Sequence, residues 1–282
     1  MTSTHEVMLP LYEGKMIHHY DHRALEFTEG DGTRELTDAD REDWAREPLP
    51  RYWVRHEVVK DRLHTVGRDC LFTGFRDVTN ATNERTVIAA LFPVVAVGNT
   101  LPLILRPTQR LWLAALLSSL VFDYLARQKI AGTHLNFLYL KQLAILPPAT
   151  FNQQCPWGEG TLGEWVSRRV LALSCTSRSM IPLAREVTGE DRIYRWDTEA
   201  REQLRAELDA AMFYLFGIEE DDADYIMETF PIVKRQDEEA HGSYRTKERI
   251  LALLTALKAA ARTQQPYRGP LEPEDLIVED TP

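Results

Sequence analysis

The sequence has few cysteines and lacks the features of a secreted protein. Its 282 residues include only three cysteines, Cys70, Cys155 and Cys175, which are widely separated and odd in number. This spacing predicts neither a disulfide framework nor a zinc knuckle, and it is typical of a protein in the reducing cytoplasm. No basic and apolar leader opens the sequence, so secretion is not expected.

The short motifs of most catalytic sites are also missing. The sequence contains no phosphate-cradling glycine loop, no HExxH, no Cys/His ligand group and no G-x-S-x-G elbow. Its paired carboxylates occur only in acidic runs that are typical of solvated faces. These absences favour a binding module over a complete enzyme.

A histidine-rich stretch near the N-terminus is a candidate metal site. It contains His18, His19, Asp21 and His22. Adjacent histidines of a strand point to opposite sides, and no second ligand group is obvious elsewhere. A polar cluster that orients a loop or contacts a ligand is therefore favoured over a metal site.

No apolar run is long enough to cross a membrane. The best candidate, Leu111–Leu125, has 15 residues and includes Ser118, Ser119 and Asp123. A membrane-spanning helix needs roughly 20 apolar residues. We therefore predict a buried helix here and no membrane partner.

Acidic residues are scarce in the central, most apolar third of the chain. From Thr86 to Ala149 there are five cations and one acid, Asp123, which gives a net charge of +4. The segments before and after it carry −5 and −9, and the whole chain carries −10. Local positive charge attracts a polyanion even in an acidic protein, although a buried core segment also carries few acids.

The order of the hydrophobic patterns predicts an α+β protein. Residues 71–78 alternate like a strand, and the apolar runs 87–97 and 101–105 predict two strands paired across a turn. Thr108 is expected to cap a long buried helix that ends near Ala126. Further helices are expected at 162–181, 197–217 and 246–262. The predicted divisions are a mixed β-rich domain with the buried helix (1–149), a helical C-terminal section (150–265) and an acidic, proline-containing tail (266–282).

Several long stretches occur in an order that is familiar. They are LPLYEGKMIHHYDHR, RYWV, GFRDVTNATNERTVIAALFP, VGNTLPLIL, LVFDYLARQKIAGTHLNFLYLKQLAILPP and AELDAAMFYLFGIEEDDADYIMETFPIVKRQDEEAHGSYRTKERIL. Together they resemble the C-terminal half of large bacterial adenine-N6 DNA methyltransferases. Those are the Eco57I-like methylases of single-chain (type IIG) restriction–modification systems and of phage-defence systems such as DISARM and BREX. The resemblance covers roughly residues 9–262.

This resemblance implies a target-recognition domain of mixed β-structure, followed by a helical section. In the family this half chooses the DNA sequence, while an upstream Rossmann-like domain binds S-adenosylmethionine and carries an Asn-Pro-Pro-Tyr motif. The present sequence has no Asn-Pro-Pro-Tyr and no glycine-rich cofactor strand, and it begins about where the upstream domain would end. The implied partners are double-stranded DNA and a methyltransferase catalytic domain or subunit. No cofactor is expected in this chain, which should not methylate DNA by itself.

Two polar loops, 76–85 and 127–136, are the candidate DNA contacts. Specific recognition needs cations for phosphates, and amide or guanidinium groups for base edges. We expect Arg127 and Lys129 to hold phosphates. The full group of candidates is Arg76, Asn80, Asn83, Arg85, Arg127, Lys129, Thr133, His134 and Asn136.

Structural roles remain open for several of these residues. Asn80 and Asn83 are suited to cap turns, Arg85 could pair with Glu84 or Asp77, and Asn136 could satisfy buried backbone groups. Motif residues shared by proteins with different target sequences are more often scaffold than base readers. Less recognisable stretches, 28–47 and 62–70, are therefore further candidates for base readers.

Two other functions compete with DNA recognition. The acidic helical part after residue 149 would suit an interaction subunit that docks a separate methylase or nuclease partner without binding DNA. A stand-alone hydrolase or nuclease is the third alternative, supported only by scattered carboxylates and histidines.

Overall fold

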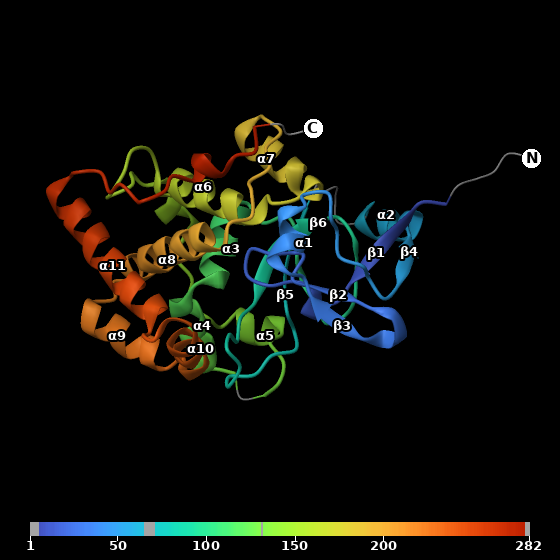
Figure 1. Cartoon of the computed structure of the whole chain (residues 1–282), viewed down its shortest axis with the longest axis horizontal. Helices are drawn as coiled ribbons and strands as arrows, with labels where there is room; N and C mark the ends of the chain where they lie inside the picture. Colours follow the sequence, from blue (N-terminus) through green and yellow to red (C-terminus); the bar gives the residue numbers. More distant parts are fainter. Residues whose placement is uncertain (1–5, 65–70, 131, 280–282) are drawn as a thin grey trace, which may run out of the picture.

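In the residues that it describes, the computed structural model combines helices with three small sheets, which confirms the predicted α+β fold (Figure 1). It describes residues 6–64, 71–130 and 132–279, so Cys70 and residues 65–70 lie outside the described part. Figure 1 shows the N-terminal sheets at one end of the molecule and the C-terminal helices at the other. The central third of the chain lies between them.

The N-terminal section holds two of the sheets. Strand β1 (Met8–Tyr12) pairs antiparallel with β4 (Trp53–Arg55) and parallel with β7 (Ala96–Val97). Strands β2 (Leu25–Phe27) and β3 (Thr33–Glu35) form an antiparallel pair. Helices α1 (Asp38–Glu42) and α2 (His56–His64) belong to the same section.

The third sheet has the order β6-β5-β8, with β5 (Leu71–Phe75) between β6 (Ala89–Pro93) and β8 (Leu103–Ile104). The predicted strand at 71–78 is confirmed, but the direct pairing of 87–97 with 101–105 is wrong. Every residue of β5 is buried. Because buried backbone groups must be paired, both edges of β5 need a neighbouring strand, and β8 supplies the second one.

The two faces of this sheet contact two separate hydrophobic clusters. Leu71 and Phe75 belong to the larger cluster, whereas Phe72 belongs to the smaller one beneath the N-terminal sheets. Strand β6 divides in the same way, with Leu91 in the larger cluster and Phe92 in the smaller. Successive side chains of a strand point to opposite faces, so a continuous apolar sequence is required here.

The long helix predicted from Thr108 to about Ala126 is in fact two helices, α3 (Arg110–Ser118) and α4 (Leu120–Arg127). Ser119 between them has an extended backbone, and its hydroxyl accepts a hydrogen bond from Phe122 N at 3.4 Å. Asp209 Oδ1 accepts a second one from Leu120 N at 2.7 Å. These two acceptors satisfy amides that a continuous helix would have paired internally.

The helical C-terminal section follows short helix α5 (Phe137–Leu140). The helices predicted at 197–217 and 246–262 are confirmed, while the one predicted at 162–181 ends at Ser174. The section comprises α6 (Leu162–Ser174), α7 (Ile181–Thr188), α8 (Thr198–Leu215), α9 (Glu220–Glu228), α10 (Pro231–His241) and α11 (Arg245–Thr263). Short 3₁₀ turns lie at η1 (Gly14–Met16), η2 (Glu29–Asp31), η3 (Pro148–Asn152), η4 (Arg178–Met180) and η5 (Pro273–Leu276).

A buried arginine connects the N-terminal section to the helical section. The guanidinium of Arg23 donates to the carbonyl oxygens of Arg41, Asp43 and Arg46. It also donates to the carbonyl and hydroxyl oxygens of Thr176, at 3.0 and 3.2 Å. In the part of the chain that the structure describes, no helix has the length and hydrophobicity needed to cross a membrane.

Candidate nucleic-acid interface

A single buried carboxylate organises the two predicted loops. Asp123, in the first turn of α4, is completely buried. Its Oδ2 atom accepts hydrogen bonds from Arg85 Nε at 3.1 Å, Thr86 N at 2.8 Å and Val87 N at 3.1 Å. Its Oδ1 atom accepts one from Arg127 Nε at 2.9 Å. The only acid of the basic third therefore joins the first loop to the helix that precedes the second.

Arg127 uses its guanidinium to hold the first loop in place. It donates to the carbonyl oxygens of Asn83 at 2.8 Å, Glu84 at 2.7 Å and Thr229 at 3.1 Å. Its guanidinium carbon lies 4.1 Å from the centre of the Phe230 ring. With its side chain only 9% exposed, Arg127 presents its charge to the interior.

Arg85 has a similar interior position. Its side chain is 4% exposed and pairs with Asp123, not with Glu84 or Asp77. The guanidinium also donates to Ser118 O at 2.6 Å. The structure thus places two of the predicted DNA-contacting arginines, Arg85 and Arg127, in the scaffold beneath the loops.

The asparagines of the first loop shape its turn. Asn80 Oδ1 accepts hydrogen bonds from the backbone N and the hydroxyl of Thr82, at 2.9 and 3.0 Å. Asn83 N donates to Asn80 O at 3.1 Å. Asn80 therefore forms a side-chain turn, while Asn83 is exposed at the tip of the loop.

The second loop lies directly beside the first. Thr79 N donates to Thr133 O at 2.9 Å, and Leu135 N donates to Asp77 O at 2.7 Å. His134 Nδ1 lies 2.8 Å from Asp77 Oδ2, although the histidine side chain is 59% exposed. The two candidate loops, which are far apart in sequence, are therefore adjacent in the structure.

Four exposed side chains on these loops form what we call the loop surface: Asn83, Lys129, Thr133 and His134. Lys129 makes no ion pair with any residue in the described ranges. Asn136 lies next to this surface and caps α5, with its Oδ1 accepting from Leu138 N at 2.9 Å and Tyr139 N at 3.3 Å. The loop surface combines an available cation with amide, hydroxyl and imidazole groups.

Arg76 faces a different part of the molecule. Its Nε donates to Ile17 O at 2.9 Å, and its side chain borders a cleft next to residues 15–18. Burial lowers the pKa of Arg76 from its usual value to about 10, which still leaves it charged at neutral pH. Arg76 therefore borders this cleft and is not part of the loop surface.

The other candidate stretches are only partly described. Residues 28–47 contain β3 and α1, whereas 65–70, within the stretch 62–70, lie outside the described part. Among described residues, no group of three or more His, Cys, Asp or Glu side chains is arranged to hold a metal ion.

The sequence did not identify Asp123 as the organising residue. The sequence does contain an indication of this role, because an isolated acid in an apolar and otherwise basic segment must be paired if it is buried. The partners of Asp123 could not be assigned, since Arg85 is 38 residues away in sequence.

No protein-family model, curated protein or solved structure matches this chain.

Proposed function

We propose that this chain is the DNA sequence-recognition part of a bacterial adenine-N6 DNA methyltransferase of a restriction–modification or phage-defence system. The catalytic methylase, with its S-adenosylmethionine, would be a separate domain or subunit. The ordered sequence motifs support the family, and the loop surface supports contact with DNA.

The loop surface is the observation that carries this proposal. Lys129 offers an uncompensated cation for a phosphate, and Asn83, Thr133 and His134 offer donors and acceptors for base edges or the sugar-phosphate backbone. The buried bonds of Asp123 hold both loops in position before any ligand arrives. Such preorganisation reduces the entropy lost on binding.

The first test compares Lys129→Ala with Arg262→Ala. Both substitutions remove one exposed cation, but Arg262 lies in the last turn of α11, away from the loops. We expect Lys129→Ala alone to weaken duplex binding and to reduce the slope of log Kd against log salt by about 1. Fluorescence anisotropy with a labelled duplex at low and moderate salt, with and without a methylase partner, measures both quantities.

Two results would contradict the proposal. Equal binding by wild type, Lys129→Ala and Arg262→Ala would remove the loop surface from the DNA interface. Absence of duplex binding, both alone and with the methylase partner, would reject DNA recognition as the function.

An interaction subunit is the second candidate, and exposed apolar residues beside the loops favour it. Phe137, Leu138 and Ile145 are 39%, 70% and 53% exposed, on or just after α5. Such neighbouring apolar side chains are typical of protein contact sites. A stable complex with a methylase that never binds the duplex, in the experiment above, would select this function.

A further inference from the structure

A cleft behind the first loop contains charged groups that the proposed function does not use. It consists of two adjoining hollows of about 190 and 510 Å³. Both are bordered by Glu84, Glu202, Arg205 and Gln236, so Arg205 lies where they meet. Helix α8 supplies Arg205, and Lys15, His18, His19, Asp21 and Ala24 of the N-terminal section also border the larger hollow.

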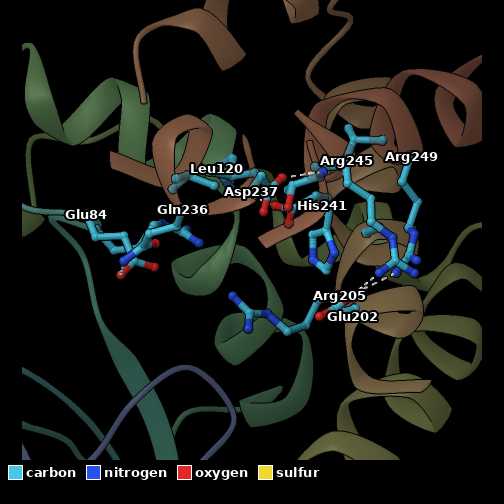
Figure 2. A pocket seen from close by; sticks show the side chains of 15 residues that line it. Glu84, Leu120, Glu202, Arg205, Gln236, Asp237, His241, Arg245 and Arg249 are labelled. Atoms are coloured by element: carbon cyan, nitrogen blue, oxygen red, sulfur yellow. Dashed lines mark hydrogen bonds and ion pairs between the residues drawn. The ribbon is translucent and has the colours of Figure 1, made fainter. Parts of the chain in front are cut away.

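Arg205 has no partner among the residues that the structure describes. It is partly buried, yet it makes no hydrogen bond or ion pair with them. Figure 2 shows its guanidinium reaching into the open part of the pocket, away from the cluster of Glu202, Arg245 and Arg249. Within that cluster, Glu202 lies 3.7 Å from Arg245 and 3.4 Å from Arg249. Glu202, one turn before Arg205 on α8, is thus already paired with other arginines, and Asp209, one turn after it, accepts a hydrogen bond from Leu120 N at 2.7 Å.

His19 is a second unpaired polar group in the same cleft. Its ring is 2% exposed, and neither Nδ1 nor Nε2 has a hydrogen-bond partner among the residues that the structure describes. The ring of His18 contacts it edge-on, with the centroids 5.0 Å apart. Burial, reinforced by the nearby Arg76, lowers the pKa of His18 to about 3. A buried imidazole without a partner is unfavourable, so a ligand that bonds to it would stabilise this site.

None of the carboxylates that border the larger hollow forms an ion pair with Arg205 in the described part of the chain; they are Asp21, Glu35, Asp38, Glu84 and Glu202. Asp21 pairs with Arg41 at 2.9 Å. Asp38 accepts hydrogen bonds from Trp196 Nε1 at 3.0 Å and from a neighbouring hydroxyl. Glu84 accepts one from Gln236 at 3.4 Å. The same hollow is bordered by the cations Lys15, Arg41, Arg76, Arg201 and Arg205. Among them, Arg205 is the one that makes no hydrogen bond or ion pair with the described residues, so the place for an anion is beside it.

We propose that this cleft binds a phosphate group, with Arg205 as its counter-ion and His19 as a hydrogen-bonding partner. A guanidinium matches the geometry of phosphate oxygens and binds two of them at once. The larger hollow falls within the size range of small-molecule sites, roughly 300 to 1,000 Å³. A nucleoside monophosphate or a backbone phosphate of DNA would supply the same group.

The test measures binding of inorganic phosphate, a nucleoside monophosphate and a short duplex to the intact chain by calorimetry. We expect Arg205→Gln to weaken phosphate binding by about tenfold or more, since it removes a charged hydrogen-bond donor. Arg262→Gln, which removes an exposed cation elsewhere, should bind phosphate as wild type does. Equal affinity of Arg205→Gln and wild type, or no saturable phosphate binding by wild type, would overturn the proposal.

A second variant protects this test against a folding defect. Arg205→Lys keeps the charge but loses the planar fork, so it should fold and bind phosphate more weakly than wild type. Wild-type affinity in this variant would also argue against the site. Competition then identifies the source: phosphate that displaces the duplex indicates a DNA phosphate, and phosphate that leaves it bound indicates a small ligand. The Lys129 test remains independent of either result, because Lys129 does not border the cleft.

Discussion

Asp123 is the residue on which the loop surface depends most. Its carboxylate has no exposed area and balances two guanidinium groups, those of Arg85 and Arg127. The same oxygens also accept two backbone amides of the first loop. Removing its charge would leave two cations without compensation in a region from which water is largely excluded.

We therefore expect Asp123→Asn to lower the free energy of unfolding by about 3 to 5 kcal/mol. The substitution preserves size but leaves both arginines without a counter-charge. Asp224→Asn is the matched control, because Asp224 pairs with Lys247 at the surface and is 47% exposed. The control should cost less than about 1 kcal/mol. Urea unfolding measures both, and similar losses in the two variants would show that the buried network contributes little.

At the scale of the residue, sequence reasoning recognised polar loops but could not separate scaffold from surface. Asn80 and Asn136 are in the structural roles that the sequence had left open, a turn and a helix cap. Arg127 and Lys129 were predicted to act alike, yet the side chain of Arg127 is only 9% exposed whereas Lys129 is exposed. Side chains that are two residues apart at the end of a helix point in different directions. The position of Asp123 decides that Arg127, and not Lys129, is paired in the interior.

At the scale of the element, α5 shows how a cap and a binding residue can be distinguished. Asn136 accepts from two amides at the start of this short helix. We expect Asn136→Ala to lower the free energy of unfolding by about 1 kcal/mol. Asn136→Ser should lower it much less, because serine is also a good helix cap. Thermal or urea unfolding checks this pair of variants.

Duplex binding by Asn136→Ser separates the two roles. A serine keeps the cap but cannot reproduce a two-point amide contact with a base. If Asn136 acts only as a cap, this variant should bind DNA as wild type does. A stable variant with clearly weakened binding would instead make Asn136 a DNA contact.

The helices were predicted better than the strand pairing. Helix α8 begins and ends close to the predicted bounds 197 and 217, because its Asp197 cap and the left-handed Gly217 act locally. The break at Ser119 depends on Asp209, and the place of β8 beside β5 depends on burial of both faces of the sheet. Neither partner lies close in sequence, so local patterns could not reveal them.

At the scale of the whole molecule, the larger hydrophobic cluster combines residues from β5, α3, α4 and α6 with those of α8 and α11. Several titratable groups are buried together with these apolar residues. Their burial shifts their pKa values, and the free energy of unfolding therefore depends on pH. Burial, with the nearby Arg76, lowers the pKa of His18 to about 3, so the folded protein keeps this histidine neutral well below its usual pKa. The unfolded chain binds a proton on it near its ordinary value of about 6.5.

The stabilising contribution of neutral His18 is therefore complete above about pH 6.5 and is lost as the pH falls toward 3. When the pH is lowered from about 7 to about 5, the free energy of unfolding of wild type should fall by about 2 kcal/mol relative to that of His18→Asn. Buried Asp209, whose pKa is raised to about 6, has the opposite effect, but it is present in both proteins and cancels in this comparison.

Urea unfolding at the two pH values gives the required difference, and His64→Asn serves as a control for losing one exposed histidine on α2. If the difference in free energy of unfolding between wild type and His18→Asn is the same at both pH values, His18 is protonated equally in the folded and unfolded states.

The sequence alone determined the α+β class, the main C-terminal helices and the stretches from which the loop surface is built. These follow from periodicity, caps and turn residues, which act over a few neighbouring positions. The tertiary structure decided which cations are buried against Asp123, which strand completes the central sheet and that Arg205 and His19 border the same hollow. Those outcomes depend on contacts between residues far apart in the chain, where burial and charge pairing outweigh local preference.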